Sequence, residues 1–372
     1  MNWKKKDFTV KMYSGKSDFD WFFGNLFFQS PNQNLSLCDI ENPVQEAAIE
    51  LGKMDGMLLE SSCFKSGVFL RDSAGKLYNS SLVANEIGEL EYFNVNSEYR
   101  PVSLLKEIHC VLCSSRDYKT PKLALFNDKG AQIWEIDGQG TKGIVANELL
   151  LLRSIHNYRN TGIEAREIES GNLVWSVEAD NWPFPNFEVS DILVSKDYAY
   201  ITSTKAAGIA GLDLSTGQLL QSWHTLPTGT TLGPQQSTVL PNPAHSVLHE
   251  EAGKILGLTG YYYWEIDLQT GALQAQDCTS EFKPRRLRAM TRPVCQGGHL
   301  FFSSDEVFEK PDGTLGHDIK LAAFNWRTRQ IDWEWPFDHP GEGLYQIGMP
   351  KVQGDYLAAA DTGGQLHIFK KM

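Results

Sequence analysis

A short segment recurs along this chain: an apolar run, then Asp or Asn, then a tight turn that most often ends in Thr-Gly or Ser-Gly. The clear copies are Ala165–Trp175, Gly211–Leu219 and Glu265–Leu273, and looser ones are Ala124–Trp134 and Ala323–Trp333. Gly at the last turn position accepts the positive φ of a sharp reversal, and the Asp can bond nearby backbone amides. Each copy therefore predicts a strand, a tight turn and a second strand paired with the first.

The copies recur at roughly 40 to 58 residues, which predicts a radial array of small sheets, a β-propeller. Paired apolar segments such as Asp191–Ile201 and Arg292–Phe302 predict two inner strands for each blade. We therefore expect an all-β fold: a single β-propeller domain, residues 1–372, built from four-stranded antiparallel blades.

The number of blades depends on how the ring closes. The last apolar segment, Leu366–Phe369, has no partner strand after it, so a strand from the other terminus must pair with it. Asp7–Tyr13 or Asn34–Ile40 could supply that strand, which gives seven blades, the count that we favour. Eight blades follow if residues 1–43 hold a degenerate blade as well as the closing strand. Only 32 residues separate that region from the turn at Gly75, which favours seven.

The repeat resembles that of the PQQ-like, quinoprotein-type propellers, whose signature is Ala-x-Asp-x-x-Thr-Gly-x-x-x-Trp. The match covers five copies and degenerate ones near Asp39 and Gly75, and so most of the chain. The resemblance implies a propeller in which tryptophans dock between blades. It does not imply the quinone, which many proteins with these repeats lack, and we expect no cofactor.

Trp134, Trp175 and Trp333 stand four residues after the Gly position of their copies. A large ring there, on an outer strand, can reach the next blade and bury much apolar area. Gln221 and Ala275 occupy the equivalent positions of two other copies, which predicts that the blades are not uniform.

Composition favours a soluble intracellular protein. Apolar residues make up 41% of the chain and charged residues 22%, with no apolar run near 18 residues, so we expect no membrane span. The segment Met1–Asp7 lacks the apolar region of a secretory signal, which predicts a cytoplasmic protein. The six cysteines are scattered, which favours free buried thiols over disulfides.

Two residue pairs have the spacing of metal ligands but the wrong local structure. Cys110 and Cys113 lie in a predicted strand, where residues three apart point to opposite faces. His245 and His249 would lie about 13 Å apart on a strand, at about 3.3 Å per residue. We therefore expect no metal site.

Net charge limits the partners. The formal net charge of −12 argues against nucleic acid and favours basic or neutral partners. Against this background the segment Lys283–Arg292 has five basic residues in ten. We favour ion pairs between its arginines and the many acids. The alternative is an anion site in the central channel formed by Arg285, Arg286, Arg288 and Arg292.

Long loops are predicted on one face of the propeller, where connections between blades and between the second and third strands emerge. They are rich in aromatics and proline, as in Asn181–Phe187, Thr225–Pro243, Ser304–Asp318 and Trp335–Gly341. Loops on a rigid scaffold carry binding residues, and rigid aromatics anchor interfaces. The predicted partner-binding face contains Trp182, Phe184, Trp335, Phe337, Tyr158 and Arg159. The alternative is that these aromatics cover the ends of the blades.

No residue constellation indicates a reaction. Asp191, Glu107 and Glu188 lie near predicted inner strands, where paired acids would indicate a glycosidase, but we favour ordinary turn and edge carboxylates. We expect a monomeric, non-catalytic protein-interaction module, in one version an acidic inhibitor or immunity-type protein that binds a basic protein. The alternative is a carbohydrate-active hydrolase or lyase with its site in the central funnel. We expect neither nucleic-acid nor membrane partners.

Overall fold

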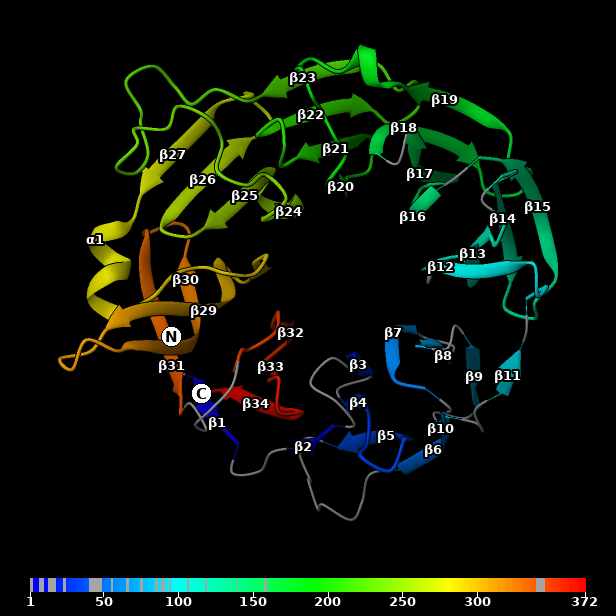
Figure 1. Cartoon of the computed structure of the whole chain (residues 1–372), viewed down its shortest axis with the longest axis horizontal. Helices are drawn as coiled ribbons and strands as arrows, with labels where there is room; N and C mark the ends of the chain where they lie inside the picture. The colour runs from blue at the N-terminus through cyan, green and yellow to red at the C-terminus, as the bar shows by residue number, and fades with distance from the viewer. Residues whose placement is uncertain are drawn as a thin grey trace. The chain divides into compact units, whose positions relative to one another are not determined.

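The described residues are almost entirely strands, which form eight antiparallel sheets in two compact units. A computed structural model describes residues 3–6, 10–12, 18–22, 25–39, 49–54, 56–64, 67–73, 76–83, 86–87, 91–93, 95–105, 107–117, 119–138, 140–156, 159–338 and 345–372. Each unit contains four sheets, and in Figure 1 the sheets of each unit follow one another in chain order.

The N-terminal unit comprises Val10–Trp182 together with the turn Leu214–Gly217. The innermost strand of each sheet contacts that of the next, as β3 contacts β7 and β12 contacts β16. The elements are β2 (Val10–Lys11); β3 (Phe19–Phe22), β4 (Asn25–Gln29), β5 (Asn34–Asp39) and β6 (Ile49–Lys53); β7 (Leu58–Phe64), β8 (Gly67–Asp72), β9 (Leu77–Val83), β10 (Glu86–Ile87) and β11 (Glu91–Phe93); β12 (Tyr99–Leu105), β13 (Cys110–Ser115), β14 (Lys122–Asn127) and β15 (Gln132–Asp137); β16 (Gly140–Ala146), β17 (Leu149–His156), β18 (Arg159–Glu167) and β19 (Leu173–Val177); and η1 (Ala179–Asn181).

The C-terminal unit comprises Met1–Thr9, Pro183–Asp213 and Gln218–Met372. Its innermost strands β20, β24, β28 and β32 also contact one another in sequence. The elements are β1 (Trp3–Lys5); β20 (Asp191–Val194), β21 (Tyr198–Ser203), β22 (Gly208–Asp213) and β23 (Leu219–Trp223); β24 (Ser246–His249), η2 (Glu250–Ala252), β25 (Lys254–Thr259), β26 (Tyr262–Asp267) and β27 (Leu273–Asp277); α1 (Thr279–Phe282), η3 (Lys283–Arg285), β28 (Val294–Gln296), β29 (His299–Glu309), β30 (Leu315–Asn325) and β31 (Gln330–Phe337); and β32 (Lys351–Gln353), β33 (Tyr356–Ala360) and β34 (Gln365–Lys371). No helix of the described chain is long and apolar enough to cross a membrane.

An N-terminal strand closes the last sheet, as the sequence predicts. The order of this sheet is β1-β34-β33-β32, and Trp3 pairs with Lys371 while Lys5 pairs with Phe369. The strand β1 precedes the predicted segment Asp7–Tyr13, of which β2 (Val10–Lys11) also pairs with β34. The other candidate, Asn34–Asp39, is instead β5 in a different sheet. The protein is thus an all-β propeller of four-stranded antiparallel sheets, with β1 as the outer strand of its last blade.

The described strands give eight sheets, the alternative count rather than the favoured seven. The spacing argument took the turn at Gly75 to join the third and fourth strands of a blade. That turn joins β8 to β9, the second and third strands, and Gly75 itself lies outside the described residues. Asp72 accepts a bond from the backbone N–H of Lys76 there, as Asp361 does from Gln365 between β33 and β34. Because two kinds of turn share an Asp, the sequence spacing undercounts by one blade.

The predicted tryptophan docking is confirmed at three places. The indole nitrogens of Trp134 and Trp175 donate to the carbonyls of Ile168 and Leu214, each at 2.8 Å, in the turn of the next sheet. Trp333 donates to the carbonyl of Trp3 at 3.2 Å. Each ring is buried, so the bond satisfies the only polar atom of a large apolar side chain.

Candidate functional site

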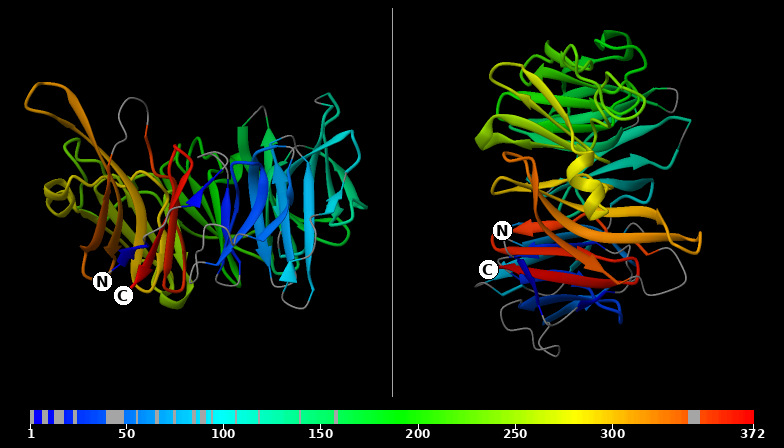
Figure 2. Two further views of the ribbon diagram at one scale, coloured as in Figure 1. Left: turned by 90° about the horizontal axis from the view of Figure 1, so that it is seen from below. Right: turned by 90° about the vertical axis from the view of Figure 1, so that its left-hand side faces the viewer.

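The strands β29 and β30 continue past their own sheet as a long hairpin. They pair without a break from His299 opposite Asn325 to Glu309 opposite Leu315. The sequence predicts a long loop over Ser304–Asp318, but the structure places most of it in these two strands. The left view of Figure 2 shows this hairpin, in orange, extending beyond the neighbouring sheets of the C-terminal unit.

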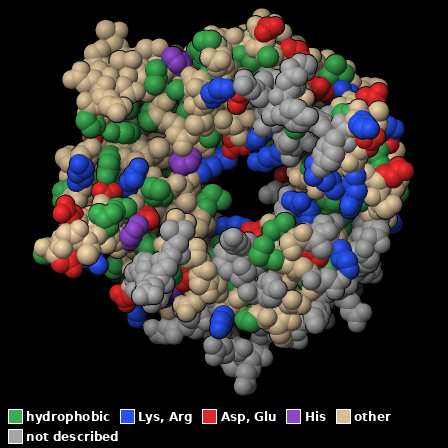
Figure 3. Space-filling model, in the orientation of Figure 1, with side chains coloured by type: hydrophobic (Ala, Val, Ile, Leu, Met, Phe, Trp, Pro, Cys, Tyr) green, Lys and Arg blue, Asp and Glu red, His purple; other side chains and the backbone are tan. Residues whose placement is uncertain are grey.

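We call residues 305–318 the hairpin arm. The arm has five acidic residues and one lysine, Lys310. Two large apolar side chains on it face solvent, because Val307 is 43% exposed and Leu315 is 68% exposed. Figure 3 shows acidic, basic and hydrophobic side chains interleaved in this part of the C-terminal unit. An acidic surface with exposed apolar side chains suits a partner that is basic and partly apolar.

The base of the arm is fixed by contacts with two other segments. The Tyr261 hydroxyl donates to Glu306 at 2.6 Å, and the backbone N–H of Arg288 donates to the Ser304 hydroxyl at 2.8 Å. The Arg286 guanidinium lies 4.1 Å from the centre of the Phe308 ring. Burial and the Glu306 carboxylate raise the pKa of Tyr261 to about 12, so this phenol remains a donor at neutral pH. The arm is therefore a supported projection.

The basic segment before β28 makes ion pairs with several acids, as the favoured interpretation has it. Arg285 lies 3.2 Å from Glu281 and 3.6 Å from Glu334. Arg292 donates to the carbonyl of Ser246 at 2.8 Å and pairs with Asp191. Arg286 stacks on Phe308, so the guanidinium groups of Arg285, Arg286 and Arg292 have different partners.

Two of the three acids predicted near the inner strands make ion pairs, and the third lies in a turn. Asp191 is the partner of Arg292, and Glu188 pairs with Lys205 at 2.6 Å. Glu107 lies in an exposed turn between β12 and β13. Asp191 and Glu188 are thus each held in an ion pair with a different basic residue.

The aromatics of the predicted partner-binding face pack against neighbouring residues. Trp182 is 7% exposed, as a side chain that covers the end of a blade would be. Phe184 stacks on Phe187 with ring centres 6.2 Å apart and contacts His224 at 5.0 Å. Tyr158 lies outside the described residues, and of Arg159 only the backbone, at the start of β18, is described.

Trp335 and Phe337 lie in the outer strand β31, which corrects the prediction that they lie in a loop. Trp335 is 5.5 Å from the ring of Phe369, and Phe337 is 4.8 Å from that of His367, both in β34 of the last sheet. Both side chains are partly exposed, so their role in partner binding remains a prediction.

Two buried carboxylates are held by several donors each. Lys254 at 2.7 Å, Arg329 at 2.9 Å and the Tyr263 hydroxyl surround Glu265. His367 and the Tyr345 hydroxyl each lie 2.9 Å from Asp361. Burial alone would raise the pKa of each carboxyl, but these partners hold both pKa values below the usual range. Because Arg329 follows β30, the Glu265 cluster joins two neighbouring sheets, whereas the Asp361 cluster lies at the turn between β33 and β34.

The cysteines and histidines do not gather into a metal site within the described part of the chain. Cys110 and Cys113 pack in separate apolar clusters, as expected for residues three apart on a strand. They are free thiols, as are Cys278 and Cys295. Burial raises the pKa of Cys113 to about 12 and those of the other three to about 11, so these thiols are unreactive at neutral pH.

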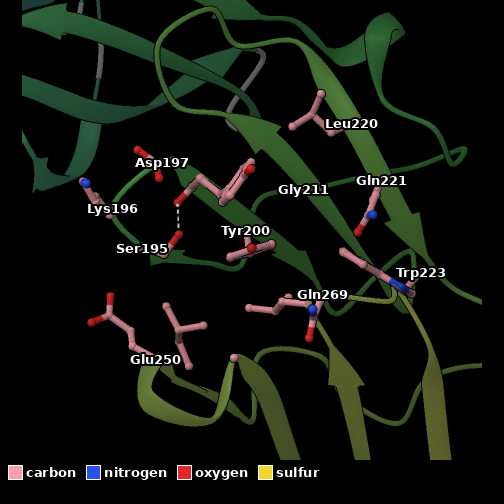
Figure 4. Close-up of a pocket in the computed structure, with 14 residues that line it drawn as sticks. Ser195, Lys196, Asp197, Tyr200, Gly211, Leu220, Gln221, Trp223, Glu250 and Gln269 are labelled. Carbon is pink, nitrogen blue, oxygen red and sulfur yellow. Dashed lines mark hydrogen bonds between the residues drawn. The ribbon is translucent and has the colours of Figure 1, made fainter.

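One feature was not predicted from the sequence, a pocket of about 510 Å³ between the sheets β20–β23 and β24–β27. Tyr200, Trp223 and Leu268 contribute to its walls, and Gln221 and Gln269 point toward it (Figure 4). The pocket lies at the turns that join first to second and third to fourth strands. These turns are short, so the sequence did not indicate a binding site there. The one signal in the sequence was Gln221, at the position where other copies have tryptophan.

The fold and its extended hairpin define the class of this protein as a β-propeller with a projecting arm. No protein-family model matches the chain, and no curated protein matches it either. Solved structures do. The computationally designed protein Ika8 is similar with a TM-score of 0.63 and 11% identity, over 97% of this chain and 98% of the other.

Two natural proteins have similar structures. Sqt1 of Saccharomyces cerevisiae aligns with a TM-score of 0.60 and 11% identity, over 98% of this chain and 99% of its own. The dihydro-heme d1 dehydrogenase NirN, in complex with DHE, aligns with a TM-score of 0.58 and 11% identity, over 90% of this chain and 67% of its own. At these identities the likeness shows the fold alone.

Proposed function

We propose that this protein is a non-catalytic interaction module that binds a basic protein partner through the hairpin arm. The observation that carries the proposal is the arm itself: a paired hairpin that extends from one sheet, acidic in sequence and with Val307 and Leu315 exposed. A long exposed strand pair is a liability unless charges protect it or a partner covers it.

The anchoring of the arm supports a binding role. Tyr261, Arg286 and the backbone of Arg288 fix its base, so a partner would meet a largely preformed surface. Preformed surfaces lose less conformational entropy on binding. The net charge of −12 would also speed the approach of a basic protein at low salt.

The test is affinity capture from lysate of the native host, with wild type and a hairpin variant, Val307→Ser/Glu309→Lys/Asp312→Lys/Leu315→Ser. These side chains are exposed, so we expect the variant to fold, with a far-ultraviolet circular dichroism spectrum like that of the wild type. We expect it to lose the captured protein, with affinity at least tenfold weaker in a binding titration with the purified partner.

A matched control variant, Glu169→Lys/Leu173→Ser, changes an exposed acid and an exposed leucine in a different blade. This control should capture the partner as the wild type does. If the hairpin variant also captures it with unchanged affinity, the arm is not the binding surface and the proposal fails.

The proposal extends to the repeat type, the cellular location and the effect on the partner. We propose that the repeats are of the PQQ-like type, because the tryptophans after the turn dock on the next sheet. We propose a cytoplasmic location, which the four free thiols support. The inhibitor or immunity-type role is the version in which binding blocks the partner, and an activity assay of the captured protein would test it.

A further inference from the structure

The docking tryptophans occupy equivalent positions in their sheets. In three sheets the outer strand has a β-bulge, with one extra residue opposite the neighbour's pairs Leu125/Phe126, Ala165/Arg166 and Ala323/Phe324. The residue opposite the first member of each pair is the docking tryptophan. These tryptophans are Trp134, Trp175 and Trp333.

The sheet β20–β23 has the same bulge with a different residue. Its bulge lies in the outer strand β23, opposite Gly211/Leu212, and the residue opposite Gly211 is Gln221. Gln221 is therefore the structural equivalent of the docking tryptophans, and it is exposed. Its strand contributes Trp223 two residues later, which donates to the carbonyl of Gly271 at 2.9 Å.

The Gly271 turn, which lies opposite Gln221, is less closely covered than the Gly171 and Gly217 turns, which lie under tryptophans. A Cβ built on Gly171 would lie 2.8 Å from the Trp134 ring, and one on Gly217 would lie 2.6 Å from the Trp175 ring. On the equivalent Gly271 it would lie 3.5 Å from the nearest atom of Gln221. The amide thus covers the glycine less closely than an indole does.

The pocket of about 510 Å³ lies in this place. Its wall includes Gln221, Trp223 and Leu268, and the ring of Tyr200, which also lines it, lies 6.4 Å from that of Trp223 (Figure 4). An apolar cavity of about 150 Å³ holds a benzene ring, so this pocket has room for a bicyclic one. All of these residues belong to the C-terminal unit.

An acceptor is also in place by sequence position. Trp134 and Trp175 donate to the carbonyls of Ile168 and Leu214, each three residues before the glycine of the turn. Leu268 precedes Gly271 by three residues and lines the pocket. A planar ring with an N–H group would find there the same kind of acceptor that the protein's own tryptophans use.

We propose that this vacant tryptophan slot is a binding site for a planar heteroaromatic ring with an N–H donor, of the indole type. The ring would lie on the Gly271 turn beside Trp223 and donate to the carbonyl of Leu268. The site is separate from the hairpin arm, so it does not depend on the proposed function.

The test is calorimetric titration with indole as the probe. We expect the wild type to bind indole with a sub-millimolar Kd. The variant Gln221→Trp supplies the missing ring from within, so it should bind indole at least tenfold more weakly and unfold about 2 °C or more higher. The matched control Ser222→Trp places the same residue on the opposite face of β23 and should change neither quantity.

A second probe distinguishes the two sources of such a ring. If N-acetyl-tryptophanamide binds more tightly than indole, the natural ligand is a tryptophan side chain of another protein. If indole binds more tightly, it is a free small molecule. If Gln221→Trp does not fold, Gln221→Phe should still weaken indole binding. The proposal is overturned if the wild type does not bind indole up to its solubility, or if filling position 221 leaves binding unchanged.

Discussion

At the scale of single residues, an indole packs directly against a glycine in a turn. The Trp175 ring contacts Gly217, whose φ of 69° and lack of a side chain both serve the turn. A side chain at this glycine would enter the space of the ring. Gly217 adopts a positive φ and also leaves room for the Trp175 ring, whereas Gly253 only adopts a positive φ. Comparing the two glycines therefore separates the two effects.

We predict that Gly217→Ala destabilises the protein more than Gly253→Ala does. Both positions have positive φ, 69° and 60°, but a Cβ at Gly253 would meet nothing within 4 Å. The variant at Gly253 should therefore lose about 1–2 kcal/mol from backbone strain alone. The variant at Gly217 should lose about 1–3 kcal/mol more because it displaces Trp175. Urea unfolding measures both, and equal losses would show that the ring contact contributes little.

The docking tryptophans could be predicted because their signal is local. Trp134 and Trp175 follow a recognisable turn at a fixed distance, and the physics of a large ring supplies the rest. The role of Gln221 could not be predicted, since it depends on the bulge opposite Gly211 and on the neighbouring sheet. Its departure from the pattern was visible, but the pocket that results is a property of two sheets.

At the scale of elements, strands were easier to predict than the connections between them. Trp333, Trp335 and Phe337 alternate with the period of a strand, but Pro336 suggested a loop. Proline is tolerated on an outer strand such as β31, where one side has no hydrogen-bonded neighbour. The hairpin arm was predicted as a loop over Ser304–Asp318. The pairing between the two halves of this polar segment has no local signal in the sequence.

We predict that β1 contributes strongly to stability through Trp3. This side chain is 4% exposed and lies 5.6 Å from the ring of Phe301 and 6.4 Å from that of Trp333. Trp3→Ala should lower the free energy of unfolding by about 3–5 kcal/mol, the usual loss for a buried aromatic. The control Lys4→Ala, exposed in the same strand, should change it by less than about 0.5 kcal/mol. A small effect at Trp3 in denaturant unfolding would mean that β1 is not essential to the last sheet.

At the scale of the whole molecule, acid should destabilise the fold. Among the described carboxyls with pKa values below the usual range are Glu265 and Asp361, for the reasons given above, and Asp332, because His299 and Asn325 bond to it. A lowered pKa stabilises the folded state above the unfolded pKa of about 4, and this contribution is lost as the pH falls through the folded pKa.

We therefore predict a free energy of unfolding that is nearly constant from about pH 7 to pH 5 and falls below about pH 4. Asp332→Asn should make the fall shallower, because it removes one of the titrating groups without emptying a buried site. Urea unfolding at a series of pH values gives the curve. A flat curve down to about pH 3 would contradict the assignment of these pairs.

The pairing of β1 with β34 also has a consequence for synthesis. Lys5 is synthesised 364 residues before its partner Phe369. At about 5–20 residues per second, the first strand waits roughly 20–70 seconds for its partner. During that time the apolar Trp3 has no sheet to enter, so a chaperone that shields β1 would suit the nascent chain. Of the described strands, β1 is made first and completes its blade last.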